Sequence, residues 1–343
     1  MSRRPRLLAI DAGGSKVDAV LLGTDGIVRG AARLTNTDHD GTGRTRHMES
    51  TLVAVRDACL DAGLDPDRLP VAELGVYCIA GADLPQDDRR IGGWLRRRGV
   101  TAEDMMRNDT FAVLRAGTDR SWGVGIVCGY GINCSAVSPD GRTYRFPAVG
   151  PISGDWGGGA DIGAEALWYA VRAEDGRGVA TSLRTLVPAH LGMRRPRQVL
   201  EALYFGRLQE SELVNLPPTV FAAAMDGDAV AREIVDRQAD EIVALARASI
   251  RKLRMSRLDV DVVLGGGIFR NDDPAFFERV ESGIHAAAPL ARITVLEAPP
   301  IVGAALLGLD SLGAPRAAYG RARAALTHER LRAHAHARDE GET

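Results

Sequence analysis

The chain opens on two short hydrophobic runs, residues 7–10 and 17–22, separated by the glycine-containing loop 11–16. Runs of this length, bounded by glycine and aspartate, predict β-strands. The turn at 25–26 follows too soon after this loop for the long helix that follows a P-loop or a Rossmann loop. We therefore predict that the loop closes a hairpin, with a third strand after the turn.

The same pattern returns in the middle of the chain. A run at 123–127, the loop 128–133, a run at 134–137 and the turn 139–141 repeat it, with matching spacing between the glycines of loop and turn. A duplicated hairpin that opens each half predicts two related domains, and 343 residues are more than one hydrophobic core usually holds. The predicted division is 1–118 and 119–314, followed over 315–343 by a terminal helix that frays into disorder.

Elsewhere, hydrophobic residues recur at helical spacing between further strand-like runs. This alternation predicts an α/β fold in both halves. Helices are expected near 48–59, 111–115, 162–171, 199–204 and 229–253, from 274 and over 302–309, and strands near 74–79, 100–106, 259–264 and 292–296.

Composition narrows the class of protein. A formal net charge of −2 with no strongly basic stretch argues against a nucleic-acid partner. No hydrophobic run reaches the roughly 18 residues that a membrane span needs. Four cysteines without a C-x-x-C pair argue against a disulfide scaffold and a structural zinc, and no apolar leader is seen. We therefore expect a cytoplasmic protein that does not bind membranes.

The two glycine loops are candidate phosphate-binding elements. Glycine lets backbone N–H groups approach an anion without a Cβ in the way. Asp11 can bind Mg²⁺ directly or through water, while Ser15 and Lys16 can reach phosphate oxygens. The alternative is an ordinary hairpin with a solvated lysine, and the second copy at matched spacing favours phosphate binding.

Two carboxylates and a glycine run are further candidates, each with a structural alternative. Asp109 follows a strand-like segment and precedes a helix, so it can cap the helix, accept a hydroxyl proton, or do both. Asp155, in the glycine-rich segment 153–159, can likewise cap a helix or bind sugar hydroxyls. The glycines at 265–267 end a strand, where they form either a simple turn or a surface for a base or ribose.

Taken in order, these motifs resemble the actin, Hsp70 and sugar-kinase ATPase superfamily, and within it the N-acetylglucosamine kinase / BadF-BadG-BcrA-BcrD group. The resemblance runs from Leu7 to Leu309. Its parts are the two phosphate loops at 11–16 and 129–134, the adenosine motif at 262–267, the catalytic-base motif Asn108-Asp109, the sugar-contacting pairs Thr35-Asn36 and Gly154-Asp155, and the small-residue opening of the last helix at 300–305.

This resemblance implies two actin-like (ribonuclease H-like) α/β domains with an interdomain cleft for ATP and substrate. It implies a kinase that uses ATP and Mg²⁺ to phosphorylate a sugar or amino sugar, and it is compatible with a homodimer. Carried over by position, the implied roles are catalysis by Asp109, phosphate binding by Gly13, Gly14, Ser15, Lys16, Gly129, Tyr130 and Gly131, adenosine binding by Gly265, Gly266 and Gly267, substrate binding by Asn36, Asn108, Asp109, Asn133, Gly154 and Asp155, and metal binding by Asp11.

Three positions depart from the pattern of the group. Tyr130 replaces a small hydroxyl residue in the second phosphate loop. Trp156 replaces an acidic residue after Asp155, and Val149 stands where amino-sugar kinases of the group often carry tryptophan. The changes at Trp156 and Val149 predict an altered sugar pocket, and Tyr130 predicts an altered contact to the γ-phosphate.

Two other functions remain open on the sequence. One is a BadF-type ATPase that activates a partner enzyme such as a CoA dehydratase or reductase. The resembling activators hold an iron–sulfur cluster between subunits, for which only Cys128 and Cys134 are candidate ligands here. The other is a sugar sensor without catalysis, against which Asp109 argues.

Overall fold

The computed structural model describes residues 5–35 and 44–339. The chain forms two compact units, and neither is continuous in sequence. The first comprises Met1–Gly125, Ser135–Pro147 and Thr294–Thr343, and the second comprises Ile126–Cys134 and Ala148–Ile293. The expected division at 118 and 314 follows the sequence repeat rather than these contacts, and it stays a prediction.

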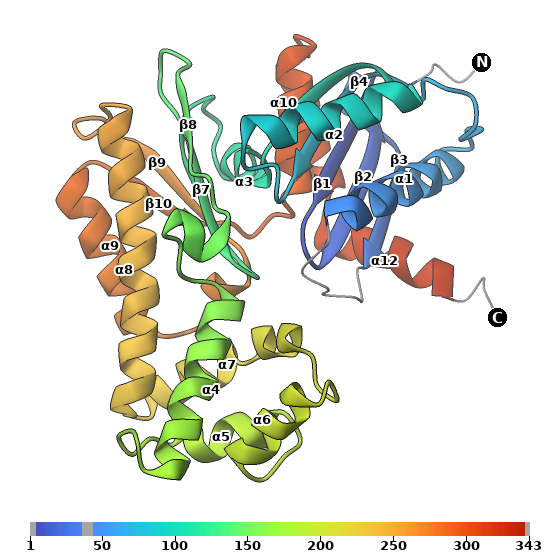
Figure 1. Cartoon of the computed structure of the whole chain (residues 1–343). Coiled ribbons are helices and arrows are strands. Elements are labelled where there is room, and N and C mark those ends of the chain that lie inside the picture. The colour runs from blue at the N-terminus through green and yellow to red at the C-terminus, as the bar shows by residue number, and fades with distance from the viewer. Residues whose placement is uncertain (1–4, 36–43, 340–343) are drawn as a thin grey trace. The chain divides into compact units, whose positions relative to one another are not determined.

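A five-stranded sheet with the order β3-β2-β1-β4-β5 lies at the centre of the first unit (Figure 1). The first three strands form antiparallel pairs, while β4 is parallel to β1 and β5 is parallel to β4. The predicted first hairpin and its third strand are therefore confirmed. The strands are β1 (Leu7–Ala12), β2 (Lys16–Leu22), β3 (Val28–Thr35), β4 (Ala72–Ile79) and β5 (Thr101–Arg107).

Helices cover both faces of this sheet. The helices of the unit are α1 (Arg44–Asp61), α2 (Pro85–Arg98), α3 (Asp109–Gly117), α10 (Ile301–Ser311), α11 (Arg316–Ala325) and α12 (His328–Asp339). Successive side chains of a strand point to opposite faces. Leu7 and Ala9 of β1 accordingly pack in a core with α3 and α10, and Leu8 and Ile10 pack in a second core with α1 and α2. Burial on both faces explains why β1 is hydrophobic at every position up to Asp11.

The segment after Pro315 is more ordered than predicted. It forms the two helices α11 and α12, and Ala318, Ala322, Leu326 and Leu331 are buried in the core of the first unit. The prediction of a single helix was therefore wrong, because two helices follow Pro315, and the fraying of the chain end stays a prediction. Small alanines at helical spacing make a face that packs closely on a sheet or helix, although such a face carries a weak hydrophobic signal in the sequence.

The second sheet has the order β10-β9-β6-β7-β8. Its strands are β6 (Gly123–Cys128), β7 (Ile132–Val137), β8 (Thr143–Arg145), β9 (Asp261–Gly265) and β10 (Arg292–Val295). The neighbouring strands β6 and β7 are joined by the second glycine loop, and β8 pairs antiparallel with β7. The second hairpin and its short third strand are thus confirmed.

The helices of the second unit lie partly beside the strands β9 and β10 and partly in a separate group away from them (Figure 1). They are α4 (Gly159–Asp175), α5 (Leu183–His190), α6 (Pro196–Tyr204), α7 (Pro217–Met225), α8 (Ala229–Lys252) and α9 (Pro274–Ala287). The long helix α8 begins at the cap Asp228, whose side chain accepts a hydrogen bond from the N–H of Ala231 at 2.9 Å. Helices α5 and α7 were not predicted, because both are short and proline lies within α5 and at the start of α7.

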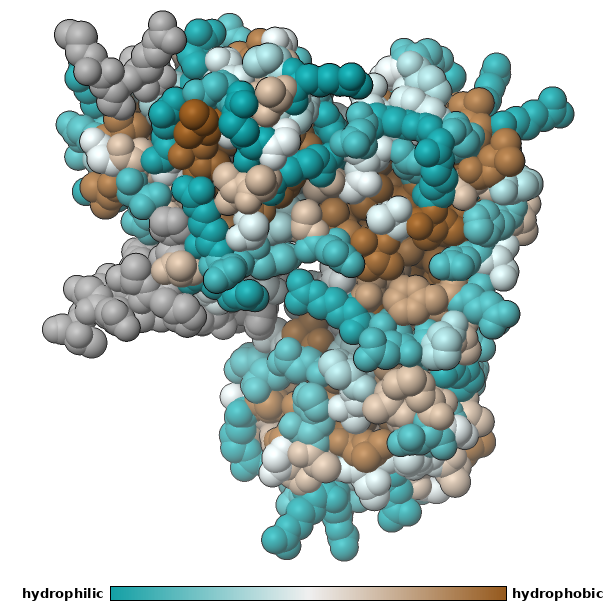
Figure 2. All heavy atoms as spheres, turned by 180° about the vertical axis from the view of Figure 1, so that it is seen from behind, coloured by the Kyte–Doolittle hydropathy of each residue, from teal (hydrophilic) through white to brown (hydrophobic). Residues whose placement is uncertain are grey.

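Hydrophilic side chains cover most of the face shown in Figure 2, and hydrophobic atoms appear as patches among them. Within the described parts of the chain, no helix combines the length and hydrophobicity needed to cross a membrane.

Candidate active site

Three carboxylates lie at the carboxyl ends of parallel strands in the first unit. Asp11 is near the end of β1, Asp83 follows β4, and Asp109 follows β5. The carboxyl ends of neighbouring parallel strands meet at one edge of the sheet, which is where ligands bind in open α/β sheets. Asp11 and Asp83 are 5% and 7% exposed. The sheet therefore gathers negative charge at one edge, where it favours cations.

This environment makes Asp109 unusually basic for a carboxylate. Burial raises the pKa of Asp109 to about 7, and the negative charges of Asp11 and Asp83 act in the same direction. The backbone N–H of Thr110 donates a hydrogen bond to the carboxylate and partly opposes this rise. A carboxylate with a pKa near neutrality is well matched to accept a proton from a hydroxyl group.

The backbone on both sides of Asp109 is held by a buried hydrogen-bond network. Asn108 Oδ1 accepts from the Thr110 N–H at 3.1 Å and from its hydroxyl at 2.6 Å, and Asn108 Nδ2 donates to Asp83 Oδ1 at 2.9 Å. The Thr110 hydroxyl is also 2.5 Å from Ser135 Oγ on β7. The cap of α3 is thus Asn108, and the interpretation of Asp109 as the cap was wrong. A substrate contact by Asn108 stays a prediction.

The first glycine loop is a tight turn with an exposed tip. The Gly13 N–H donates to the Lys16 carbonyl at 2.9 Å, and Gly14 and Ser15 are exposed. Lys16 Nζ lies 2.6 Å from Asp18 Oδ2 and 3.4 Å from Asp11 Oδ2. Burial raises the pKa of Asp11, and the positive charge of Lys16 opposes that rise. The loop therefore places a lysine ammonium group beside the proposed metal ligand.

Asp18 is a residue of this site that the sequence reasoning missed. It is fully buried on β2, and Arg33 of β3 contacts both of its carboxylate oxygens. The Arg33 and Lys16 contacts lower the pKa of Asp18 against the opposing effect of burial. An aspartate inside an otherwise hydrophobic strand was the available signal.

In the second unit, three glycine segments pack on one another. The N–H of Gly159 donates to the Gly129 carbonyl at 2.8 Å, and the N–H of Ala160 donates to the Tyr130 carbonyl at 3.0 Å. A Cβ on Gly266 would lie 2.2 Å from the Cys128 carbonyl oxygen. The structure thus brings the predicted phosphate loop 129–131 together with the predicted adenosine glycines and with the segment 157–159.

Gln238 supports the glycine segment 157–159 through a hydrogen bond. The sequence analysis did not predict this role. Gln238 is fully buried on α8, and its Oε1 accepts a hydrogen bond from the Gly158 N–H at 2.7 Å. Gly158 in turn lies so close to Gly131 that a Cβ on Gly158 would be 2.5 Å from the Gly131 Cα. Glutamine in a long helix carries no sequence signal for this role, because polar residues are common on the solvent side of helices.

Asp155 does not cap the following helix. The cap of α4 is Gly158, and Asp155 instead accepts a hydrogen bond from the Ser153 hydroxyl. The cap interpretation of Asp155 was therefore wrong, while substrate contacts by Gly154 and Asp155 stay predictions. The next residue, Trp156, stacks on Arg237, whose guanidinium carbon is 4.0 Å from the ring centroid.

Two further residues, Asn133 and Asn36, were predicted to contact the substrate. Asn133 uses its Oδ1 to accept a hydrogen bond from the Cys134 N–H at 2.7 Å. Asn36 lies outside the described residues. Both stay predictions as substrate contacts.

The donor set fits a magnesium ion held mainly by its nucleotide. Among residues 5–35 and 44–339, no group of three or more His, Cys, Asp or Glu side chains is placed to hold a metal ion. Magnesium is usually bound through one or two carboxylates together with phosphate oxygens and water. Asp11, buried at the carboxylate-rich edge of the sheet, meets this requirement.

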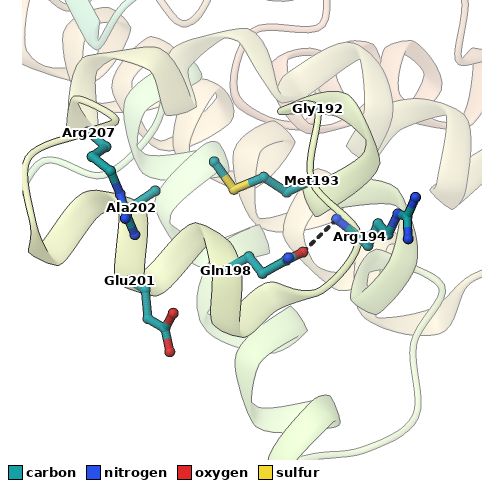
Figure 3. Close-up of a pocket in the computed structure, with 7 residues that line it drawn as sticks. All are labelled: Gly192, Met193, Arg194, Gln198, Glu201, Ala202 and Arg207. Atoms are coloured by element: carbon teal, nitrogen blue, oxygen red, sulfur yellow. Dashed lines mark hydrogen bonds between the residues drawn. The ribbon is translucent and has the colours of Figure 1, made fainter.

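A separate surface pocket of about 520 Å³ lies in the helical part of the second unit (Figure 3). Within its lining, Gln198 accepts a hydrogen bond from the Arg194 N–H at 2.9 Å. None of the predicted site residues lines it. The lining residues are Gly192, Met193, Arg194, Gln198, Glu201, Ala202 and Arg207.

Two mixed sheets with flanking helices, each sheet containing a glycine hairpin, define an actin-like α/β fold. A crystal structure from Chromobacterium violaceum, provisionally described as an N-acetylglucosamine kinase, has this fold with a TM-score of 0.70 and 22% identity, covering 89% of this chain and 99% of that chain. The chain belongs to the BadF/BadG/BcrA/BcrD ATPase family, whose sequence profile matches residues 8–308. The predicted fold class and family are therefore confirmed.

Two curated relatives cover most of the chain. The N-acetylmuramic acid/N-acetylglucosamine kinase of Clostridium acetobutylicum is 25% identical over 272 residues, which are 77% of this chain and 86% of that protein. The N-acetyl-D-glucosamine kinase of Dictyostelium discoideum is 26% identical over 315 residues, which are 89% of this chain and 98% of that protein.

Proposed function

We propose that the protein is an ATP-dependent kinase that transfers the γ-phosphate of ATP to a hydroxyl of a sugar or amino sugar. The observation that carries this proposal is Asp109, a carboxylate with a pKa near 7 fixed at the end of β5 beside Asp11. The relatives named as kinases of N-acetylglucosamine and N-acetylmuramic acid support the substrate class.

In the proposed reaction, Asp109 accepts the proton of the substrate hydroxyl while the hydroxyl oxygen bonds to the γ-phosphorus and ADP leaves. The N–H groups of both glycine loops and the Lys16 ammonium bind the phosphate oxygens, and Asp11 is the magnesium ligand. Bound Mg²⁺ would offset negative charge on the β and γ oxygens. Asn108 fixes the backbone beside the base through its contacts with Thr110, so Asp109 needs little reorganisation during transfer.

The roles of the remaining predicted residues belong to the same proposal. We assign the glycines at 265–267 to the adenosine and Asp155 with its neighbour Gly154 to the sugar. We further propose that the enzyme is cytoplasmic, where ATP is plentiful, and that it acts as a homodimer on a small molecule rather than on nucleic acid or membranes.

The proposal predicts an acceptor-dependent consumption of ATP with altered sugar preference. The altered residues Val149 and Trp156 should make N-acetylglucosamine a poorer substrate than another sugar in a panel of hexoses, amino sugars, N-acetylmuramic acid and polyols. A lost polar partner costs about 1–3 kcal/mol, which is roughly tenfold or more in preference. The measurement is kcat/KM for each acceptor by ADP release. ATP consumption that no acceptor stimulates would contradict a kinase, and N-acetylglucosamine as the best substrate would contradict the altered pocket.

The pKa of Asp109 predicts how transfer depends on pH. A protonated carboxyl group cannot accept the hydroxyl proton, so kcat/KM should fall about tenfold for each unit below a pH near 7 and level off above it. The measurement is kcat/KM between about pH 5 and pH 9 at saturating Mg·ATP, with the residual rate of Asp109→Asn as the control. A wild-type profile that stays flat through pH 7, or one that the Asn variant shares, would remove Asp109 from the role of base.

The cysteines of this chain argue against the alternative function, an ATPase that activates a partner enzyme. Such an activator needs thiolate ligands for its iron–sulfur cluster. Cys128 and Cys134 are fully buried, and burial raises the pKa of both thiols. Buried cysteines that stay protonated are packing residues rather than ligands of a cluster. We therefore retain the kinase as the proposed function.

A further inference from the structure

Charged side chains form a row across the first hairpin of the chain. The strand register pairs Asp11 of β1 with Asp18 of β2, and Asp18 with Arg33 of β3. Side chains directly opposite on neighbouring strands lie on the same face of a sheet and contact one another. Lys16, two residues before Asp18, lies on that face as well. The row therefore contains two carboxylates and two cations on a three-stranded hairpin whose other residues are mostly hydrophobic.

The two carboxylates of the row differ in how they are paired. Asp18 accepts from Arg33 Nε at 2.6 Å and Nη2 at 2.7 Å, and from Lys16 Nζ at 2.6 Å. Asp11 has the longer Lys16 contact of 3.4 Å. Asp18 thus binds both cations closely, and Lys16 is drawn toward Asp18 rather than toward Asp11.

The two cations of the row differ in their exposure to solvent. The Arg33 side chain is 9% exposed and the Lys16 side chain is 30% exposed. A lysine ammonium group has three N–H donors, and two carboxylates account for two of them. Lys16 therefore keeps a donor and a partly exposed position from which to contact a ligand, while Arg33 is committed to Asp18.

Stability alone is a weak explanation for this row. Replacing a buried ion pair by hydrophobic residues of similar volume is often neutral or stabilising. Val20, the next residue of β2 on the same face as Asp18, is a fully buried hydrophobic residue, so a hydrophobic residue would suit this face. The charges are better explained by what they do to Lys16 and Asp11.

We propose that Asp18 and Arg33 are positioning residues that hold Lys16 closer to Asp18 than to Asp11. Lys16 then pairs only loosely with Asp11, so that Lys16 serves the phosphates and Asp11 stays available to magnesium. This inference rests on the proposed function, which assigns Lys16 to phosphate and Asp11 to Mg²⁺. Arg33 neutralises part of the Asp18 charge, so Asp18 attracts Lys16 less strongly and Lys16 stays partly exposed.

The proposal predicts different effects for the two ends of the row. Asp18→Asn keeps the shape but removes the charge, so Lys16 turns to Asp11 and competes there with Mg²⁺. The Mg²⁺ concentration needed for half-maximal nucleotide binding should rise about 10–100-fold, the usual effect of losing a group that orients a metal ligand. Arg33→Gln leaves Lys16 as the nearest cation to Asp18, so nucleotide affinity should fall about tenfold with little change in the Mg²⁺ requirement.

The measurement is ADP binding by calorimetry over a Mg²⁺ titration, which needs no turnover, together with the melting temperature of each full-length variant. Asp25→Asn is the matched control, because Asp25 forms an exposed ion pair with Arg29 on the same three-stranded segment. Arg33→Lys should restore part of the nucleotide affinity, since it keeps the charge. If Asp18→Asn does not fold, the double variant Asp18→Asn/Arg33→Gln removes both buried charges and should show the same raised Mg²⁺ requirement.

The outcomes distinguish this inference from the function on which it rests. A lower melting temperature with the Mg²⁺ dependence of wild type in Asp18→Asn or the double variant would show a purely structural row and overturn the inference alone. Wild-type protein that binds no nucleotide at any Mg²⁺ concentration would overturn the proposed function and the inference with it.

Discussion

Replacing Asp109 by asparagine is expected to reduce phosphoryl transfer by about 10²–10⁴-fold, the usual range for the loss of a general base. The amide keeps the shape of the side chain but cannot accept the hydroxyl proton. The cap of α3 is unaffected, because Asn108 supplies it. Nucleotide affinity should stay within about twofold of wild type, since the phosphate contacts are assigned to other residues.

The same substitution is expected to stabilise the protein near neutral pH. The pKa of Asp109 is about 7 in the folded protein and 3.8 as a reference, so the folded state binds this proton more tightly than the unfolded state. Wild type therefore loses stability as the pH rises from about 4 to about 7, whereas the Asn variant does not. Three pH units correspond to about 4 kcal/mol at most. Because Asp109 is half-buried rather than fully buried, solvent screening reduces this to about 2 kcal/mol.

Transfer rate, nucleotide affinity and the free energy of unfolding at about pH 5 and pH 8 together test this assignment. Glu103→Gln, an exposed carboxylate on the preceding strand β5, is the control and should change none of them. Wild-type transfer in Asp109→Asn would contradict the kinase mechanism. Loss of transfer with reduced stability at pH 8 would indicate instead that the carboxylate supports the fold.

The two hairpins could be predicted because their signals are local. The short hydrophobic runs, the loop glycines and the turns at 25–26 and 139–141 are all contained within a few residues. Strand β1 was predictable for the same reason, since burial on both faces makes it a continuous hydrophobic run. Its pairing with β4 depends on residues more than sixty positions away, which only a family resemblance or a structure supplies.

The C-terminal segment shows where local signals mislead. Its alanines and arginines resemble a solvated helix, yet Ala318 and Ala322 are fully buried and Arg323 donates to the Ala116 carbonyl at 2.6 Å. Burial of such a helix depends on a complementary surface elsewhere in the chain. Single-sequence reasoning has no access to that surface.

Some residues of the candidate site could also be predicted from the sequence, and others could not. Asp109 and the glycines could be found, because they stand at strand ends in recognisable motifs. Asp18, Arg33 and Gln238 could not be assigned roles, because their importance comes from cross-strand or helix contacts. The choice between cap and base at Asp109 was also beyond the sequence, since both Asn108 and Asp109 are good caps.

Replacing Gly158 by alanine is expected to cause the largest loss of nucleotide affinity among the variants of the second unit, by more than about tenfold. Gly158 has a φ of +85°, which disfavours any side chain, and its added Cβ would lie 2.5 Å from the Gly131 Cα. The clash involves backbone on both sides, so the second glycine loop must move. Displacing a phosphate-binding loop by even about 1 Å disrupts the geometry of its N–H donors.

Gly176→Ala is the control for Gly158→Ala. It introduces the same backbone strain but displaces no glycine loop. Gly176 follows α4 with a φ of +79°, yet nothing lies within 4 Å of its added Cβ. It should therefore lose about 1 kcal/mol of stability from strain alone and keep its nucleotide affinity. Gly158→Ala should lose the same stability or more and also its ADP binding, measured by calorimetry at a temperature where both variants are folded. Equal nucleotide affinity in the two variants would show that the segment 157–159 does not support phosphate binding, because a loop that tolerates a 2.5 Å clash without losing its ligand is not holding that ligand.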